Sequence, residues 1–238
     1  MLVQCVWEHN GDDSLVYADR YIGAYTRGAS RQEALAKFPM EMRSYMLWRT
    51  GETIDCPVET EVIEEKASTL QIGDADSDVL FASEKRPLTP DEYRELKWLA
   101  MKSAADFQRL YDAIPDKDES VLPVRKTFYG EVPRTARQMY IHTKSVNSYY
   151  FGEIGVRCDS GGTIVACRKR GFDALERMPN FLDNRVFDGS YKEQWTLRKV
   201  CRRFVWHDRI HAKAMYRMGC KIFGVERIPD VFFFRGHA

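Results

Sequence analysis

Two histidines, His207 and His211, lie four residues apart in the segment WHDRIH, and the whole chain contains five histidines. Residues four apart on an α-helix share one face, so the two imidazoles can bind one ion. The same spacing also occurs by chance, and a single inward histidine is more often a core residue than a ligand. The metal hypothesis therefore depends on the surrounding helix and on a third ligand.

A helix is predicted across residues 190–219, because Ser190 and Glu193 have capping-box spacing and Gly219 is typical of a helix end. At about 100° per residue, both histidines fall within an apolar stripe, and the opposite, basic face is predicted to be exposed to solvent. Arg203 projects near the histidine face. The apolar stripe contains Val200, Phe204, His207, Ile210, His211, Ala214 and Met218, and the basic face contains Arg198, Arg202, Arg209, Lys213 and Tyr216.

A second predicted helix, at residues 135–155, carries His142 on a stripe with Met139, Val146 and Tyr149. Three histidines from two packed helices leave an open coordination position, which is typical of catalytic rather than structural metal sites. We therefore predict that His142, His207 and His211 bind a divalent metal. Imidazole ligands favour zinc, nickel or iron over magnesium or calcium. Such an ion would lower the pKa of a water or thiol, and the absence of an H-E-x-x-H pattern disfavours a peptidase.

Three further side chains are candidates for the catalytic site, and each has a structural alternative. Asp208 could orient an imidazole N–H, or it could pair with a surface arginine, which is the interpretation we favour. Arg203 could hold a substrate carboxylate, or it could pair with Glu153 or another carboxylate of the bundle. Tyr149 could donate a hydrogen bond in the pocket, or it could belong to the core.

The segments TARQMYIHTKSVNSYYFGEIG and WTLRKVCRRFVWHDRIHAKAMYRMG resemble the DinB-like (DinB/YfiT) superfamily of four-helix bundles. In that family one histidine of the second helix and two of the last helix hold the metal, and His142, His207 and His211 match those positions. The resemblance covers residues 86–238. It implies a thiol S-transferase or hydrolase, with a low-molecular-weight thiol as co-substrate and an electrophilic small molecule as substrate, in a homodimer. Many members have no established activity, so a non-catalytic metal-binding protein is the alternative.

Before about residue 80 the sequence has mainly strand-like segments and turns, and after it mainly helical segments. This change predicts an α+β fold with a small domain at residues 1–75. Strands are expected at residues 2–7, 15–21, 23–26 and 58–65, with a helix from Ser30 to Gly51 before the last strand. This β-β-β-α-β order and the helix ASRQEALAKFPMEMRSYMLW resemble the HicB-like domain, which in its family partners a toxin or a DNA-binding module. A regulatory protein that docks a partner through strand 58–65 is therefore a further alternative.

A linker is predicted at residues 76–88, ahead of a four-helix bundle at residues 89–238. The acidic run at residues 74–78 lacks the glycine and glutamate of an EF-hand loop, so it is interpreted as a connector. Thr89 and Glu92 have capping-box spacing, with Pro90 at the first helical position. The third helix of the bundle, residues 163–187, is expected in two pieces because Gly171 and Pro179 interrupt it.

Composition narrows the classes of function. Lys plus Arg total 36 against 35 for Asp plus Glu, a net charge of +1, so no strong field favours nucleic acid. No apolar run approaches the roughly 18 residues of a membrane span, and the N-terminal sequence has no basic region typical of a signal peptide. The six cysteines show no C-x-x-C spacing. Reduced thiols and a cytoplasmic protein are therefore expected.

Overall fold

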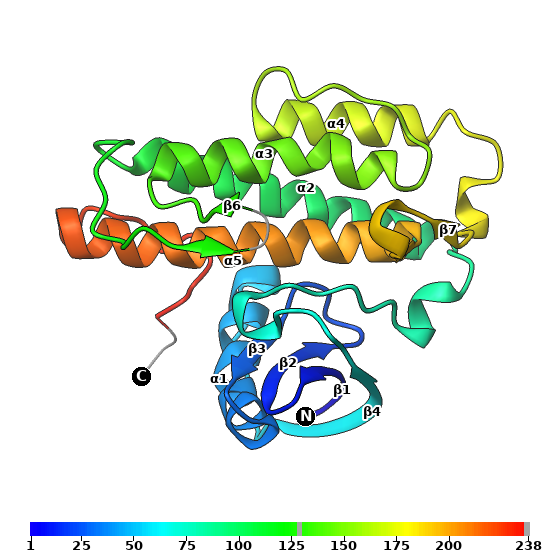
Figure 1. Cartoon of the computed structure of the whole chain (residues 1–238), viewed down its shortest axis with the longest axis horizontal. Coiled ribbons are helices and arrows are strands. Elements are labelled where there is room, and N and C mark those ends of the chain that lie inside the picture. Colours follow the sequence, from blue (N-terminus) through cyan, green and yellow to red (C-terminus); the bar gives the residue numbers. More distant parts are fainter. Residues whose placement is uncertain (128–129, 236–238) are drawn as a thin grey trace.

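The computed structural model describes residues 1–127 and 130–235, so residues 236–238 of the predicted bundle lie outside it. The fold is α+β, with a four-stranded mixed sheet at the N-terminus followed by a helical region (Figure 1). The sheet order is β3-β2-β1-β4, in which β1 is antiparallel to β2 and parallel to β4, and β2 is antiparallel to β3. Its strands are β1 (Leu2–Asn10), β2 (Asp13–Ala18), β3 (Tyr25–Gly28) and β4 (Glu59–Ala67).

Helix α1 (Arg31–Thr50) has the ends that the sequence predicts. The Ser30 hydroxyl accepts a hydrogen bond from the Glu33 amide, and Gly51 ends the helix in the left-handed region at φ 78°. One face of α1 buries Phe38 and Met42 against the sheet. The β-β-β-α-β order expected for the N-terminal part is therefore present.

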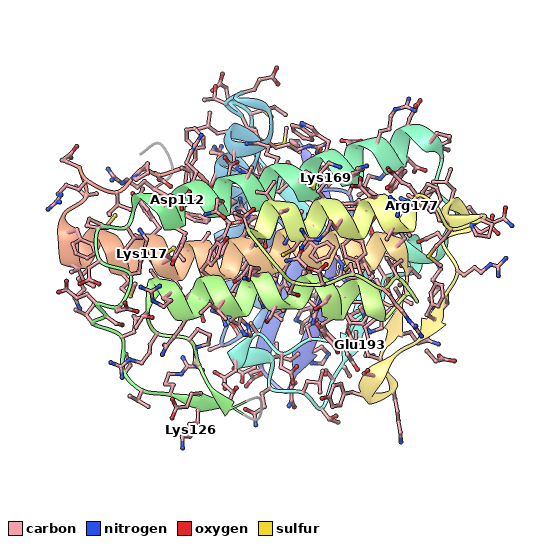
Figure 2. All side chains as sticks on the ribbon, turned by 90° about the horizontal axis from the view of Figure 1, so that it is seen from above. Asp112, Lys117, Lys126, Lys169, Arg177 and Glu193 are labelled. Atoms are coloured by element: carbon pink, nitrogen blue, oxygen red, sulfur yellow. The ribbon has the colours of Figure 1, made fainter. Side chains whose placement is uncertain are left out.

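The helical region contains four long helices whose axes are roughly aligned (Figure 2). Both α2 and α3 pack against both α4 and α5. The helices are α2 (Pro90–Ala113), α3 (Ala136–Gly152), α4 (Ile164–Leu175) and α5 (Leu197–Phe223). Two short hairpins are formed by β5 (Lys126–Thr127) with β6 (Gly130–Glu131) and by β7 (Phe187–Asp188) with β8 (Gln194–Trp195). Single 3-10 turns are η1 (Ile72–Asp74), η2 (Ala82–Lys85), η3 (Phe181–Asp183) and η4 (Ser190–Lys192).

Both predicted ends of the last helix are wrong. At Ser190 the chain forms a 3-10 turn in which Tyr191 has φ 58°, a left-handed conformation that cannot begin an α-helix. The helix begins instead after Thr196, whose hydroxyl accepts from the Lys199 amide. Gly219 lies inside α5, where a Cβ atom would approach Ile114 Cδ1 to 2.8 Å, so tertiary packing rather than termination explains this glycine. The helix ends at Gly224.

The predicted solvent-exposed basic face of α5 is also wrong. Arg202 and Arg209 are each 1% exposed, and Tyr216 is buried as well. Arg202 Nε donates to Glu84 Oε1 at 2.6 Å, and Arg209 Nη2 donates to Glu41 Oε1 at 2.7 Å. This face of α5 therefore packs against the N-terminal part, with a carboxylate opposite each buried guanidinium.

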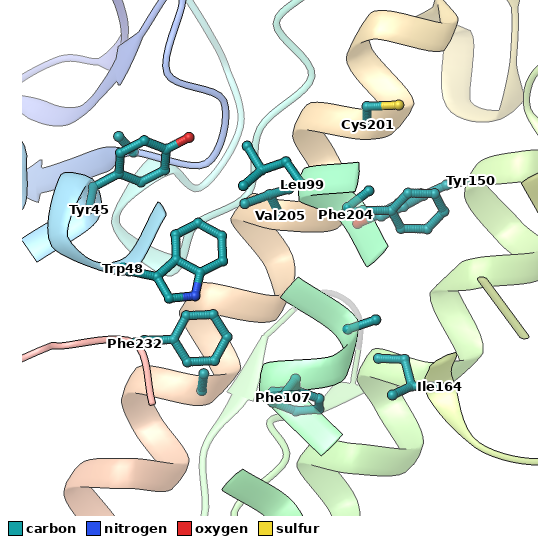
Figure 3. Packing of buried hydrophobic residues seen from close by; sticks show 14 of the residues in the cluster. Tyr45, Trp48, Leu99, Phe107, Tyr150, Ile164, Cys201, Phe204, Val205 and Phe232 are labelled. Atoms are coloured by element: carbon teal, nitrogen blue, oxygen red, sulfur yellow. The ribbon is translucent and has the colours of Figure 1, made fainter. Parts of the chain in front are cut away.

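The N-terminal part and the bundle share one hydrophobic cluster. Figure 3 shows Tyr45 and Trp48 of α1 close to Leu99 of α2, Val205 of α5 and Phe232 near the C-terminus. The segment predicted as a linker, 76–88, is partly buried, and its Val79 and Phe81 pack in a second cluster with Trp206 of α5. None of the helices in the described part of the chain combines the length and hydropathy that a membrane span requires.

Candidate metal centre

The three predicted histidines meet between α3 and α5. His142 Nε2 lies 3.1 Å from His207 Nε2, and one ring nitrogen from each of the three residues lies within 4.8 Å of the others. Two nitrogens bound to one tetrahedral ion at about 2.05 Å would lie roughly 3.3 Å apart. The distance between His142 and His207 therefore matches two ligands of one ion, and the nitrogen of His211 lies close enough to approach as a third ligand.

The two helices explain this convergence. Thr135, seven residues before His142, forms with Gln138 a capping box that sets where α3 begins. His207 and His211 lie one turn apart on α5, with ring centroids 4.6 Å apart. The Tyr150 ring meets the His207 ring edge-on at 6.1 Å. His207 is buried, whereas His142 and His211 are only partly buried, so the centre lies close to the surface.

Burial sets the protonation state of the three rings. It lowers the pKa of His142, and it lowers the pKa of His211 to about 3. The pKa of His207 is lowered well below 6.5, first by burial and then by the neighbouring imidazoles of His211 and His142. All three rings are therefore neutral at pH 7. A neutral imidazole offers the lone pair that a metal ion needs, so the donor chemistry of the site fits the ion.

Asp208 lies next to His207 in the sequence, but its carboxylate is directed elsewhere. Both of its oxygens accept hydrogen bonds from Arg168, at 2.5 Å from Nη1 and 3.0 Å from Nη2. Both side chains are fully buried. Asp208 therefore pairs with an arginine, but the surface pair that we favoured is wrong, because this pair lies in the core between α4 and α5. Among the described residues, no hydrogen-bond partner meets the buried Nδ1 of His207.

Arg203 is held among aromatic rings beside the centre. Its guanidinium lies 4.7 Å from the Trp206 ring and 5.5 Å from the Tyr150 ring, and Nη1 donates to the Ser77 carbonyl at 2.8 Å. The alternative partner named from the sequence, Glu153, accepts from the Ser190 amide at 2.7 Å. Arg203 therefore connects α5 to the segment that follows the sheet.

Tyr149 is 37% exposed and lines an open surface hollow of about 630 Å³ with Glu153 and Ser190, none of the histidines being part of its lining. Its neighbour Tyr150 is the tyrosine that contacts His207. The other cavity, about 350 Å³ and lined in part by Arg49 and Leu96, does not include the histidines either. Tyr150, and not the predicted Tyr149, is therefore the tyrosine next to the histidines.

Two polar residues of the bundle core, Arg168 and Asn147, were not predicted from the sequence. Arg168 Nε donates to Asn147 Oδ1 at 2.9 Å, and both side chains are fully buried. A signal was present in the sequence. Arg168 lies four residues after Ile164 and four before Phe172, on the apolar face of α4, where a charged residue is unusual.

No protein-family model matches the chain, and no curated protein or solved structure matches it. The resemblances to the DinB-like and HicB-like families therefore stay predictions. The geometry of the three histidines is therefore the basis for proposing a function.

Proposed function

We propose that this protein is a DinB-like metalloprotein in which His142, His207 and His211 hold a divalent ion, zinc in preference to nickel or iron. The observation that carries the proposal is the approach of three neutral imidazole rings from two helices to within 4.8 Å. Three neutral rings packed together without a ligand would lose hydration that contacts between the rings do not replace. A shared ion explains why the chain keeps them there.

The proposed activity is the reaction of an electrophilic substrate with a small thiol, as in an S-transferase, or with water, as in a hydrolase. When bound, the ion supplies Lewis acidity that lowers the pKa of a water or thiol. The protein contributes three neutral donors and leaves one side of the site open to substrate, because His142 and His211 are only partly buried. The substrates of this proposal are a low-molecular-weight thiol and an electrophilic small molecule, bound by a homodimer. All six cysteines are unpaired, which agrees with a reducing cytoplasm.

A non-catalytic role for the ion is the second candidate. It is favoured by one observation, namely that neither of the two cavities described above is lined by any of the three histidines. In this case the ion would fasten α3 to α5 without binding a substrate. The exposed edge strand β4 would then be available to dock a partner.

Metal content tests the centre directly. Untagged wild-type protein, His207→Ala and the matched control His9→Ala would be compared by elemental analysis after dialysis. His9 is a suitable control because its ring stacks on Trp7 and contacts Glu65, both in the sheet. We expect close to one ion per chain in the wild type and in His9→Ala, and loss of the ion in His207→Ala. Equal metal content in all three proteins would refute the site.

The cobalt-substituted protein separates the two candidates. Cobalt(II) in a three-histidine site absorbs visible light, and a thiol that enters the open position adds a sulfur-to-metal charge-transfer band. Adding 2-mercaptoethanol should therefore change the spectrum if the ion is accessible. An unchanged spectrum at saturating thiol would support the non-catalytic role.

A further inference from the structure

One buried arginine connects all four helices of the bundle. Arg168 of α4 donates through Nη1 to the Ala100 carbonyl of α2 at 3.0 Å and through Nε to Asn147 Oδ1 of α3 at 2.9 Å. It also pairs with Asp208 of α5 through two hydrogen bonds, and its guanidinium lies 4.3 Å from the Phe204 ring. A single planar group therefore fixes the mutual position of four elements.

Two of these partners belong to the helices that carry the histidines. Asp208 directly follows His207 on α5, and Asn147 lies five residues after His142 on α3. Sliding either helix by one residue would shift it about 1.5 Å and turn it about 100°, which would break the contact with Arg168 and move the imidazoles apart. The hydrogen bonds of Arg168 thus define the register in which the three rings meet.

Stability alone does not explain a charged pair at this position. Removing two charges from water is unfavourable, and well-packed apolar residues in place of a buried pair are often neutral or stabilising. The best-attested role of such groups is to select one register among several. We propose that Arg168, together with Asp208 and Asn147, is a positioning residue that holds His142 opposite His207 and His211; as a role in metal binding, this inference rests on the proposed function.

The test replaces the pair by apolar residues in the double variant Arg168→Met/Asp208→Leu. The matched control, Arg209→Met/Glu41→Leu, removes a buried pair from the same helix that faces α1 instead of α3 and α4. Affinity for cobalt(II) would be measured by titration of its visible absorption. Both variants should stay folded; affinity should fall about 10-fold or more in the first and stay within about twofold of wild type in the control, because groups that orient ligands typically contribute 10- to 100-fold.

A readout without metal separates this inference from the proposed function. In the NMR spectrum of protein labelled with ¹⁵N-histidine, the 3.1 Å contact between His142 and His207 should give a nuclear Overhauser cross-peak between the two rings. The variant Arg168→Met/Asp208→Leu should lose this cross-peak. If the wild type binds no metal, the proposed function fails and this contact alone decides whether Arg168 positions the rings. Wild-type affinity and an intact ring contact in the folded double variant would overturn the inference.

A single substitution covers the case in which the double variant does not fold. Asn147→Leu removes the hydrogen bond from Arg168 to α3, together with the bond from Asn147 Nδ2 to the Lys144 carbonyl within α3, and leaves the pair with Asp208 in place. We expect weaker cobalt binding and a weakened ring contact. An Asn147→Leu protein with both properties unchanged would equally overturn the positioning role.

Discussion

Replacing Glu41 by leucine should destabilise the protein strongly, although Glu41 lies on α1 and does not contact the metal centre. Its carboxylate accepts from Arg209 Nη2 at 2.7 Å, and the two side chains are 5% and 1% exposed. Lys213 lies 3.8 Å away, but it is about one-third exposed and can turn to solvent. After Glu41→Leu, the buried charge of Arg209 would have no acidic partner.

The size of the effect follows from this burial. Removing one partner of a buried pair typically costs about 3–5 kcal/mol, because the remaining charge is not compensated. For a protein of this size, 1 kcal/mol corresponds to roughly 2–4 °C in the unfolding midpoint. We therefore expect the midpoint of Glu41→Leu to fall by roughly 6–20 °C, and that of Glu41→Leu/Arg209→Met to return close to the wild type.

Thermal unfolding followed by circular dichroism would measure these midpoints. The control is Asp173→Asn, which removes the partner of Lys169 in a pair that is exposed on α4. Exposed pairs contribute little, so the control should unfold with the wild type. A Glu41→Leu midpoint equal to that of the control would mean that Arg209 is hydrated, and the buried interface between α1 and α5 would be refuted.

Three other measurements probe the core, the centre and a buried acid. Gly171→Ala should destabilise the protein by roughly 1–3 kcal/mol, because its Cβ would lie 2.0 Å from Phe151. The control is Gly152→Ala, whose Cβ would have no atom within 4 Å, and urea unfolding measures the stability of both variants. Zinc at 100 times its Kd should stabilise the wild type by about 2.7 kcal/mol in thermal unfolding, and a zinc-independent midpoint would contradict the centre. Burial raises the pKa of Glu8 above 4.5, so the native state binds this proton more tightly than the unfolded state. Stability from this group is thus lost as pH rises through the raised pKa, and in urea unfolding at pH 5 and pH 8 Glu8→Gln should gain stability over wild type at the higher pH.

The features that the sequence predicted well depend on local hydrogen bonds. The Thr89 hydroxyl and the Glu92 amide are three residues apart, and they form the capping box at the start of α2 that their spacing indicates. The facing of His207 and His211 is equally local, because one helical turn separates them. Predicting His142 as the third ligand required knowing that a second helix packs against the first. That prediction was based on the apolar stripe of the helix that carries His142 and on the family resemblance.

The features that the sequence missed depend on residues far apart in the chain. Arg202 and Arg209 form a basic face that resembles an exposed one until Glu84 and Glu41 are brought opposite it, and these lie 118 and 168 residues away. No local pattern distinguishes an exposed arginine from one whose partner arrives through tertiary structure. The Ser190 error has a different cause, since the capping spacing was correct but the left-handed Tyr191 excludes the helix.

Helix α5 pairs with the N-terminal part on one side and with the bundle on the other. These contacts limit which variants can test whether a partner docks on β4. Arg209 joins it to α1 of the N-terminal part, and Asp208 joins it to α4 of the bundle. Deleting residues 1–75 would expose the charged and aromatic face of α5, so the remaining bundle should unfold, and lost partner binding would then say nothing about docking. Substitution of the exposed Ile63 on β4 leaves those contacts in place. A partner that binds through β4 should be lost with Ile63→Lys while metal content stays unchanged.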